Sequence, residues 1–465
     1  MSIHDIGTRR ELFVDDTLIE RLDGARLTLH HPQPAGVALA LDAPWEGRFC
    51  GYATVLFDGD RYLMTYRGWM AVGEDAAPAF TCLATSPDGI HWEKPDLGLV
   101  ELNDSTSNNI ILHERDHGAV CHNFAPFIDT RPGVPADERF KALGGTWRVT
   151  GGLLPYASAD AVHWRRLSDK PVVTHPTFGF DSQNVAFWSE AEGRYVCFYR
   201  YFTEGEEGKR WVCRQSSDDF LHWGETVEMR SVGGPIEQIY IQQTTPYYRA
   251  PHLYVATAAR FNPGRTAITA EQAALAGVEE RYWHDTADGV LMTTRAHSDA
   301  YHRTFMESWI RPGPGPEHWV SRANYPACGV VPTGENEMSV YVNRRYAQEA
   351  AYIERLTLRP DGFCSLNAGY GGGEMVTVPL RFSGDRLSLN LATSAAGDVR
   401  VELQDASGAA IEGHALADAD ELIGDQLDRI VTWGGRADVS ALAGRPVRLR
   451  FVLRDANLFS MRFIT

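Results

Sequence analysis

The chain has 465 residues, a formal net charge of −17 and a charged fraction of 23%. A strongly acidic surface repels nucleic acid and anionic membranes, so neither is an expected partner. The first residues show no basic segment followed by an apolar run, and no stretch approaches a membrane span, so we expect a cytoplasmic protein. Aromatic residues make up 11% of the chain, which suits an all-β core or a surface that stacks against sugar rings.

The seven cysteines are scattered singly, without the CxxC or CxH spacing of metal sites. Their odd number argues against a disulfide framework, so we expect reduced, mostly buried thiols, no metal and no cofactor. Cys121 and His122 are adjacent. Neighbouring residues of a strand point to opposite faces, however, and we therefore expect no thiol mechanism from this pair.

Short runs of β-forming residues alternate with Gly, Asp, Asn and Pro, which predicts an all-β protein. Clear helical periodicity is confined to residues 270–276. A seven-residue pattern from Ser to His-Trp occurs at 86–92, 158–164 and 217–223, with a weaker copy around 298–302. It is similar to the Asp box of sialidase-like propellers, with a shorter spacing. Repetition at equivalent places favours a structural hairpin turn over catalytic histidines.

Pairs of strands joined by a turn also recur along the chain. Their first strands begin at or near residues 52, 122, 180, 237 and 324. Five units at intervals of about 50–80 residues predict a five-bladed β-propeller, because each blade is a small antiparallel sheet. We expect the leading strands, at 11–14 and 26–29, to complete the last blade.

The pattern changes after residue 358. A Gly-rich passage at 369–373 is followed by neither GK[ST] nor a helix, so it predicts a connection and not a phosphate loop. The last ninety or so residues alternate as strands do, which predicts a β-sandwich. We therefore assign residues 1–360 to the propeller and 361–465 to the sandwich.

Six segments carry a resemblance to known proteins: LFVDD at 12–16, PWEG at 44–47, NFAPF at 123–127, DSQN at 181–184, FME at 305–307 and the tail at 441–451. With them, the chain resembles an uncharacterised bacterial group often labelled family-32-like. A five-bladed propeller followed by a β-sandwich is similar to glycoside hydrolase families 32 and 43. The resemblance implies a glycoside hydrolase, an exo-acting glycosidase or transglycosidase, that acts on a short oligosaccharide.

In the family 43 pattern, one Asp begins the inner strand of the first blade, a second Asp that of the third, and a Glu belongs near the fourth. Asp181 matches the second Asp, and Glu237 matches the Glu. Tyr52 stands where the first Asp belongs, and the family 32 signatures WMNDPNG, RDP and EC are absent. These departures leave retention, inversion and hydrolysis itself open.

Glycosyl transfer requires one carboxyl group to protonate the leaving oxygen and another to attack or to activate water. Glu237 is the predicted general acid, because its apolar neighbours would desolvate it. Its alternative role is a strand-edge carboxylate paired with an arginine. Asp181 would hold water, tune the acid or bind hydroxyls, and its alternative role is a turn that caps the strand.

Glu46 is the candidate to replace the missing first Asp, and its alternative role is that of a solvated loop acid. Glu307 lies in an apolar run, where a charge requires a partner. Arg311 or Arg295 would then neutralise it in a structural ion pair.

Polar and aromatic side chains near the beginnings of several strands predict a small carbohydrate pocket. The candidates are Tyr52, Arg67, His122, Asn123, Gln183, Asn184, Tyr240, Gln243, Arg295, Asn324 and Tyr325. We expect a small carbohydrate as the ligand, and the oligomeric state stays open. Two alternatives also stay open: a phosphorylase like those of family 130, which a cluster of Arg, Lys and His around the pocket would favour, and a non-catalytic carbohydrate-binding propeller. Convergence of Asp181, Glu237 and one of Glu46 or Glu307 on one pocket would favour the hydrolase.

Overall fold

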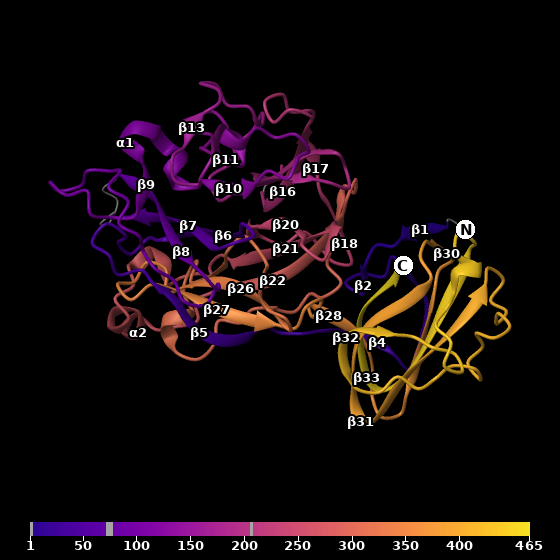
Figure 1. Ribbon diagram of the computed structural model, residues 1–465. Coiled ribbons are helices and arrows are strands. Elements are labelled where there is room, and N and C mark those ends of the chain that lie inside the picture. Colours follow the sequence, from indigo (N-terminus) through magenta and orange to yellow (C-terminus); the bar gives the residue numbers. More distant parts are fainter. Residues whose placement is uncertain (1–2, 71–77, 205–207) are drawn as a thin grey trace. The chain divides into compact units, whose positions relative to one another are not determined.

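The computed structural model describes residues 3–70, 78–204 and 208–465 (Figure 1). Its contacts divide the chain into two compact units. One unit is residues 32–357, and the other combines residues 1–31 with 358–465. Strands dominate both units, which confirms the all-β prediction. Among the described residues, no helix is long and apolar enough to cross a membrane.

The described part of the first unit forms five sheets that follow one another along the chain, which confirms the five-bladed propeller. Blade 1 contains β6 (Gly51–Phe57), β7 (Tyr62–Trp69), β8 (Ala79–Ser86) and β9 (Ile110–His113). Blade 2 contains β10 (Ala125–Ile128), β11 (Phe140–Gly144), β12 (Leu154–Ser158) and β13 (Arg165–Arg166). Blade 3 contains β14 (Val185–Ser189), β15 (Arg194–Phe202), β16 (Arg210–Ser217) and β17 (Val227–Glu228).

Blade 4 has two strands more than the first three blades. It contains β18 (Arg230–Val232), β19 (Ile239–Ile241), β20 (Thr244–Tyr247), β21 (Ala250–Asn262), β22 (Thr286–Arg295) and β23 (Ala300–His302). Blade 5 contains β24 (Asn324–Pro326), β25 (Val331–Gly334), β26 (Glu337–Arg344), β27 (Tyr352–Leu358) and β5 (Gln33–Ala40). Short helical segments connect these strands: α1 (Glu114–His117), η1 (Gly118–His122), η2 (Ala136–Glu138), α2 (Ala270–Leu275), η3 (Glu280–Tyr282) and η4 (Pro316–His318).

The helix α2 confirms the one helical segment expected from periodicity, within one residue of its predicted end. Thr269 begins it with a capping box, in which its side chain and that of Gln272 each accept a hydrogen bond from the other's backbone N–H.

The ring of blades is closed by β5, which pairs antiparallel with β27 so that Leu39 lies opposite Ile353. The prediction that the strands at 11–14 and 26–29 complete the last blade is wrong. In the structure, β2 (Glu11–Leu12) pairs with β33 (Val447–Ile464), and β4 (Arg26–Leu29) pairs with β28 (Cys364–Ala368), both in the second unit. The segment that enters the propeller is the next one along the chain, after residue 31.

The three clear copies of the repeated turn share one hydrogen-bond pattern. In the first copy, Asp88 Oδ1 accepts from two backbone N–H groups at 2.8 Å, and Trp92 Nε1 donates to a backbone carbonyl oxygen at 3.1 Å. Asp160 and Asp219 repeat the arrangement in blades 2 and 3. The histidines of these turns are exposed, and each forms a side-chain hydrogen bond with the aspartate of its own turn. The structural interpretation of the repeat is confirmed.

A chain of buried amides crosses the propeller axis. Gln243 Nε2 donates to Gln183 Oε1 at 2.5 Å and to a backbone oxygen of blade 5 at 3.2 Å. Gln183 Nε2 donates in turn to the Tyr52 carbonyl oxygen at 2.9 Å and to Thr54 Oγ1 at 2.8 Å. Both glutamines are completely buried. The amide chain therefore joins the inner strands of four blades.

The second unit is one large sheet system with its own core. Its strands are β1 (His4–Gly7), β2, β3 (Ile19–Asp23), β4, β28 (Cys364–Ala368), β29 (Gly373–Thr377), β30 (Leu380–Phe382), β31 (Arg386–Asp405), β32 (Asp425–Ile430) and β33 (Val447–Ile464), with η5 (Ser440–Leu442) between the last two. The Gly-rich passage connects β28 with β29, as predicted. The β-sandwich architecture of this unit stays a prediction.

Candidate active site

All five blades contribute to one cavity of about 500 Å³, where the inner strands begin. We call it the axial cavity. Its lining comprises Tyr52, Arg67 and Trp69 of blade 1; His122, Thr146, Trp147, Arg148 and Val149 of blade 2; Phe178 and Asp181 of blade 3; Tyr240, Arg281, Tyr282 and Asp285 of blade 4; and Ser321, Arg322 and Tyr346 of blade 5. Five predicted site residues therefore lie together: Tyr52, Arg67, His122, Asp181 and Tyr240.

Arg200 connects two of these residues at the wall of the cavity. Its guanidinium forms an ion pair with the Asp181 carboxylate. It also lies over the ring of Tyr240, with 4.7 Å between the guanidinium carbon and the ring centroid. Arg200 is only 1% exposed, whereas the Asp181 side chain is 36% exposed. A buried cation thus holds the accessible carboxylate beside the phenol.

Tyr240 is the phenol that these charges affect most. Burial alone would raise its pKa, but the guanidinium groups of Arg322, Arg200 and Arg210 outweigh burial and lower the pKa to about 8. Arg322 and Arg210 lie 5.1 and 5.3 Å from the ring centroid of Tyr240. A phenol with a pKa near neutrality can donate a proton efficiently at physiological pH.

His122 is held in its neutral form beside Arg67. Burial and the nearby guanidinium groups of Arg67, Arg322 and Arg200 lower the pKa of His122 well below its usual range. Arg67 Nη1 can therefore donate to a ring nitrogen of His122, which lies 3.2 Å away. The sequence predicts that His122 begins a strand, but in the structure it ends the helical turn η1. Its neighbour Cys121 is buried, and burial raises the pKa of that thiol to about 12.

Strained backbone surrounds the cavity. Tyr52, Phe180, Gln243 and Arg322 have φ angles of 53°, 65°, 46° and 63°, in the left-handed region that favours glycine. Each such conformation costs about 1 kcal/mol or more and persists only where the surrounding structure requires it. Tyr52 and Arg322 line the cavity, and Phe180 directly precedes the lining residue Asp181. Such a group of strained residues is typical of a functional site.

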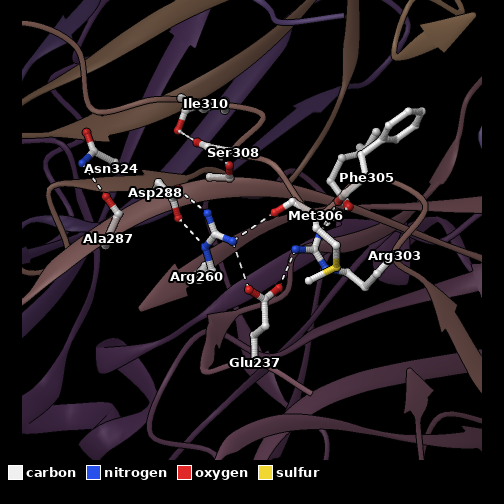
Figure 2. A network of polar contacts seen from close by, with 12 residues as sticks. Glu237, Arg260, Ala287, Asp288, Arg303, Phe305, Met306, Ser308, Ile310 and Asn324 are labelled. Carbon is white, nitrogen blue, oxygen red and sulfur yellow. Dashed lines mark hydrogen bonds and ion pairs between the residues drawn. The ribbon is translucent and has the colours of Figure 1, made fainter. Parts of the chain in front are cut away.

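Glu237, the predicted general acid, does not line the axial cavity. Figure 2 shows its carboxylate between two arginines: Arg260 Nη1 lies 3.0 Å from Oε1, and Arg303 Nη2 lies 2.5 Å from Oε2. Arg260 is also paired with Asp288 at 2.7 Å. Because Arg303 is almost fully buried, its charge requires this partner. The structure therefore supports the ion-pair role that the sequence left open for Glu237.

Glu46 and Glu307 also lie outside the cavity. Glu46 is completely buried and accepts hydrogen bonds from the Tyr66 hydroxyl at 2.6 Å, the Ala43 N–H at 2.7 Å and Lys94 Nζ at 2.8 Å. It is therefore not a solvated loop acid but anchors the segment before β6, and its catalytic role stays a prediction. Glu307 is exposed in an irregular segment after β23, so the strand predicted there is absent from the described fold.

The side chains of the predicted amide ligands form hydrogen bonds with the backbone. Asn123, Gln183, Asn184, Gln243 and Asn324 are at most 1% exposed. Their side chains donate to backbone carbonyl oxygens, for example from Asn123 to Phe180 at 2.7 Å and from Asn324 to Ala287 at 2.8 Å. The amides therefore shape the cavity without lining it, because irregular backbone at the beginnings of the strands requires buried partners.

Two further predicted ligands lie outside the cavity. Arg295 is at the end of β22, where it pairs with Leu253. Tyr325 lies behind Tyr240, with 5.1 Å between their ring centroids.

Sequence reasoning missed Arg200, Arg322 and Tyr346. A Tyr-Arg pair occurs at 66–67 in β7 and again at 199–200 in β15. This repetition in the second strands of two blades is a sequence signal that could have identified Arg200. Arg322 lies in the irregular segment before β24, and Tyr346 lies in the connection between β26 and β27, where the sequence carries no comparable pattern. In the described part of the chain, no group of three or more His, Cys, Asp or Glu side chains is arranged to hold a metal ion.

No protein-family model and no curated protein matches the chain. Similar solved structures include a putative glycoside hydrolase from Parabacteroides distasonis, with 14% identity, a TM-score of 0.43 and coverage of 72% of this chain and 97% of that one. A putative glycoside hydrolase from Bacteroides ovatus shows 12% identity, a TM-score of 0.41 and coverage of 74% and 98%. A third similar structure comes from the GH130 family of mannoside phosphorylases, which contains glycoside hydrolases that target beta-1,2 mannosidic linkages in Candida mannan. It shows 13% identity, a TM-score of 0.43 and coverage of 75% of this chain and 97% of that one. The five blades of this chain rest on its own strand pairing.

Proposed function

We propose that this protein is a carbohydrate-active enzyme that hydrolyses a glycosidic bond in the axial cavity. The observation that carries the proposal is the pairing of a carboxylate, Asp181, with a phenol of lowered pKa, Tyr240, through one buried guanidinium. Aromatic rings of Trp69, Trp147 and Tyr282 line the same cavity and offer flat faces to a sugar ring.

Asp181 and Tyr240 take different roles in the reaction: the carboxylate acts as the base, and the phenol acts as the acid. Asp181, neutralised by Arg200, is the base that takes a proton from water as the water oxygen bonds to the anomeric carbon. Tyr240 gives its phenolic proton to the leaving oxygen as the glycosidic bond breaks. The proton on Asp181 then returns to Tyr240 through solvent, so that water has been added across the bond. Attack by water in one step inverts the anomeric configuration.

A panel of aryl glycosides, furanosides included, tests this function with the purified protein. The wild type is expected to cleave at least one member, and Asp181→Asn is expected to lower kcat/KM by about 100-fold or more. Asp160→Asn is the matched control, since Asp160 lies in a surface turn. Failure of the wild type on the whole panel, or full activity of Asp181→Asn, would contradict the proposal. Proton NMR of the first product formed distinguishes inversion from retention.

The convergence of carboxylates that would favour a hydrolase is not found, because Asp181 is the only one of the four predicted acids in the cavity lining. The cluster of Arg67, Arg148, Arg281, Arg322 and His122 around the same cavity favours a second candidate, phosphorolysis. If inorganic phosphate attacks the anomeric carbon, the protein needs no base, and only Tyr240 acts on the leaving oxygen. Turnover that requires phosphate and yields a sugar phosphate would replace hydrolysis by this reaction. Turnover in phosphate-free buffer would exclude it.

A further inference from the structure

Four arginines occupy corresponding places near the ends of second strands, opposite the beginnings of the inner strands. Arg67 lies opposite Gly51, Arg260 opposite Ile239 and Arg344 opposite Asn324. Arg200 lies two residues beyond the partner of the first residue of β14. Blade 2 has glycine at this place, at the end of β11.

Three of these arginines have carboxylate partners within the propeller: Arg200 has Asp181, Arg260 has Asp288 and Glu237, and Arg344 has Glu354. The repetition shows how the fold ordinarily accommodates a cation at this place. A buried guanidinium is stable there because an acid of the same blade neutralises it.

Arg67 departs from this rule. It is 4% exposed. Its Nε and Nη2 both donate to the Phe49 carbonyl oxygen, at 3.2 and 2.9 Å, and Nη2 also donates to the Tyr346 hydroxyl at 3.2 Å. Its Nη1 donates to neutral His122 at 3.2 Å. All of these partners are uncharged. No carboxylate of the described residues lies within ion-pair distance of Arg67, although Arg67 lines the axial cavity.

Arg322 lies at the same wall of the cavity and, like Arg67, has no carboxylate partner among the described residues. Its guanidinium carbon is 5.3 Å from the ring centroid of Tyr282 and 5.7 Å from that of Tyr346. Tyr346 therefore contacts both Arg67 and Arg322. Within the part of the chain that the structure describes, Arg322 also has no carboxylate partner, and it is held in a left-handed backbone conformation.

Two largely buried cations without a carboxylate counterion are unfavourable, because burial removes their hydration. The guanidinium of Arg322 presents a planar fork of N–H donors, which matches a carboxylate in two parallel hydrogen bonds. Arg67, whose Nε and Nη2 donate to Phe49, adds its positive charge. Aromatic rings flank this wall, so a ligand gains most there if it joins an anion to a ring with apolar faces. Inorganic phosphate would fit the fork but gain nothing from the rings.

We propose that Arg67 and Arg322 bind the carboxylate of an acidic sugar, so that the substrate of this enzyme is a glycoside of a hexuronic acid. The inference rests on the proposed glycoside cleavage for its catalytic meaning, but the binding of the acidic sugar does not depend on turnover.

Isothermal titration calorimetry with free hexuronates tests the proposal. Sodium glucuronate, galacturonate and mannuronate are compared with glucose, galactose and mannose, and inorganic phosphate forms a separate arm. At least one hexuronate is expected to bind at least about tenfold more tightly than its neutral sugar, because the neutral sugar lacks the charge-assisted bonds. Added salt should weaken the binding of the hexuronate and leave the neutral sugar unchanged.

The variant Arg322→Gln is expected to lose at least about tenfold in hexuronate affinity. Arg230→Gln removes one positive charge from an exposed ion pair with Asp299 and should bind as the wild type does. Arg322→Lys keeps the charge and loses the fork, and Arg67→Gln removes the second charge; both cover the case in which Arg322→Gln does not fold.

Equal affinity for hexuronates and neutral sugars, or no binding of any hexuronate, would overturn the inference. So would unchanged hexuronate binding in a folded variant of either arginine, and binding of phosphate alone would favour phosphorolysis. Hexuronate binding without cleavage of any glycoside would contradict the proposed function and leave this site standing. Cleavage of neutral glycosides without a preference for hexuronides would contradict the acidic-sugar site and leave the proposed function standing.

Discussion

The titration of Tyr240 offers the sharpest test of the electrostatics of the axial cavity. Its pKa is lowered from 10 to about 8, which corresponds to about 3 kcal/mol in favour of the folded-state phenolate. Because the folded-state pKa is the lower one, this stabilisation is fully present above the unfolded value of 10 and is lost as the pH falls through 8. The difference in unfolding free energy between the wild type and Tyr240→Phe should therefore grow by about 2 kcal/mol from pH 7 to pH 10.

Two measurements follow this change. Near-ultraviolet difference absorption should show one tyrosine ionising around pH 8 in the wild type and none there in Tyr240→Phe. Denaturant unfolding at both pH values should show the growing difference in free energy. Tyr282→Phe is the control, because burial raises the pKa of Tyr282.

Catalysis should report the same ionisation. If Tyr240 donates the proton to the leaving oxygen, kcat should fall about tenfold per pH unit above 8. Arg322→Gln should move this alkaline limb to higher pH, because Arg322 is the largest of the charges that lower the pKa of Tyr240. A wild type without a tyrosine that ionises below pH 9, or an alkaline limb that Arg322→Gln leaves in place, would refute the reasoning.

Three further predictions concern stability. Glu237→Gln should destabilise the protein by about 3 kcal/mol in denaturant unfolding, since the buried charge of Arg303 would lose its partner. Turnover at wild-type levels by the folded variant would confirm that Glu237 is not the general acid. Gly329→Ala should cost about 2 kcal/mol or more, because the added Cβ would lie 2.2 Å from the Val55 carbonyl oxygen in a left-handed conformation; a thermal melt unchanged from the wild type would contradict this. Thr269→Ala should cost about 1 kcal/mol through the lost capping box, with Thr269→Ser as the variant that retains it.

The fold could be predicted from the sequence because its signals are local. Each blade repeats an apolar strand, a turn and an aromatic strand, and three blades repeat the turn centred on Asp88, Asp160 and Asp219. Ring closure could not be predicted in the same way. Several strands near the N-terminus have similar patterns, and only tertiary packing decides that β5 and not β2 joins the propeller.

The lining of the axial cavity could be predicted in part. Asp181, Tyr52 and Tyr240 could be placed there because they stand near the beginnings of inner strands, which all face the axis. Glu237 stands at such a place as well, but whether a carboxylate there is accessible depends on the arginines of the second strand, such as Arg260. The partners of these arginines are distant in sequence, so no local pattern distinguishes a catalytic acid from a structural one.

The amide chain through Gln183 and Gln243 has a kinetic consequence. It occupies the axis between the axial cavity, which Tyr52 lines, and an apolar cavity of about 520 Å³ that Val55 of the same strand lines. In the described part of the chain, the two cavities share no lining residue. The buried amides separate the two cavities, so we expect no passage of a ligand along the axis from one to the other. If the axial cavity cleaves a glycoside as proposed, the product should act as a competitive inhibitor, because it would leave from the cavity that the next substrate enters.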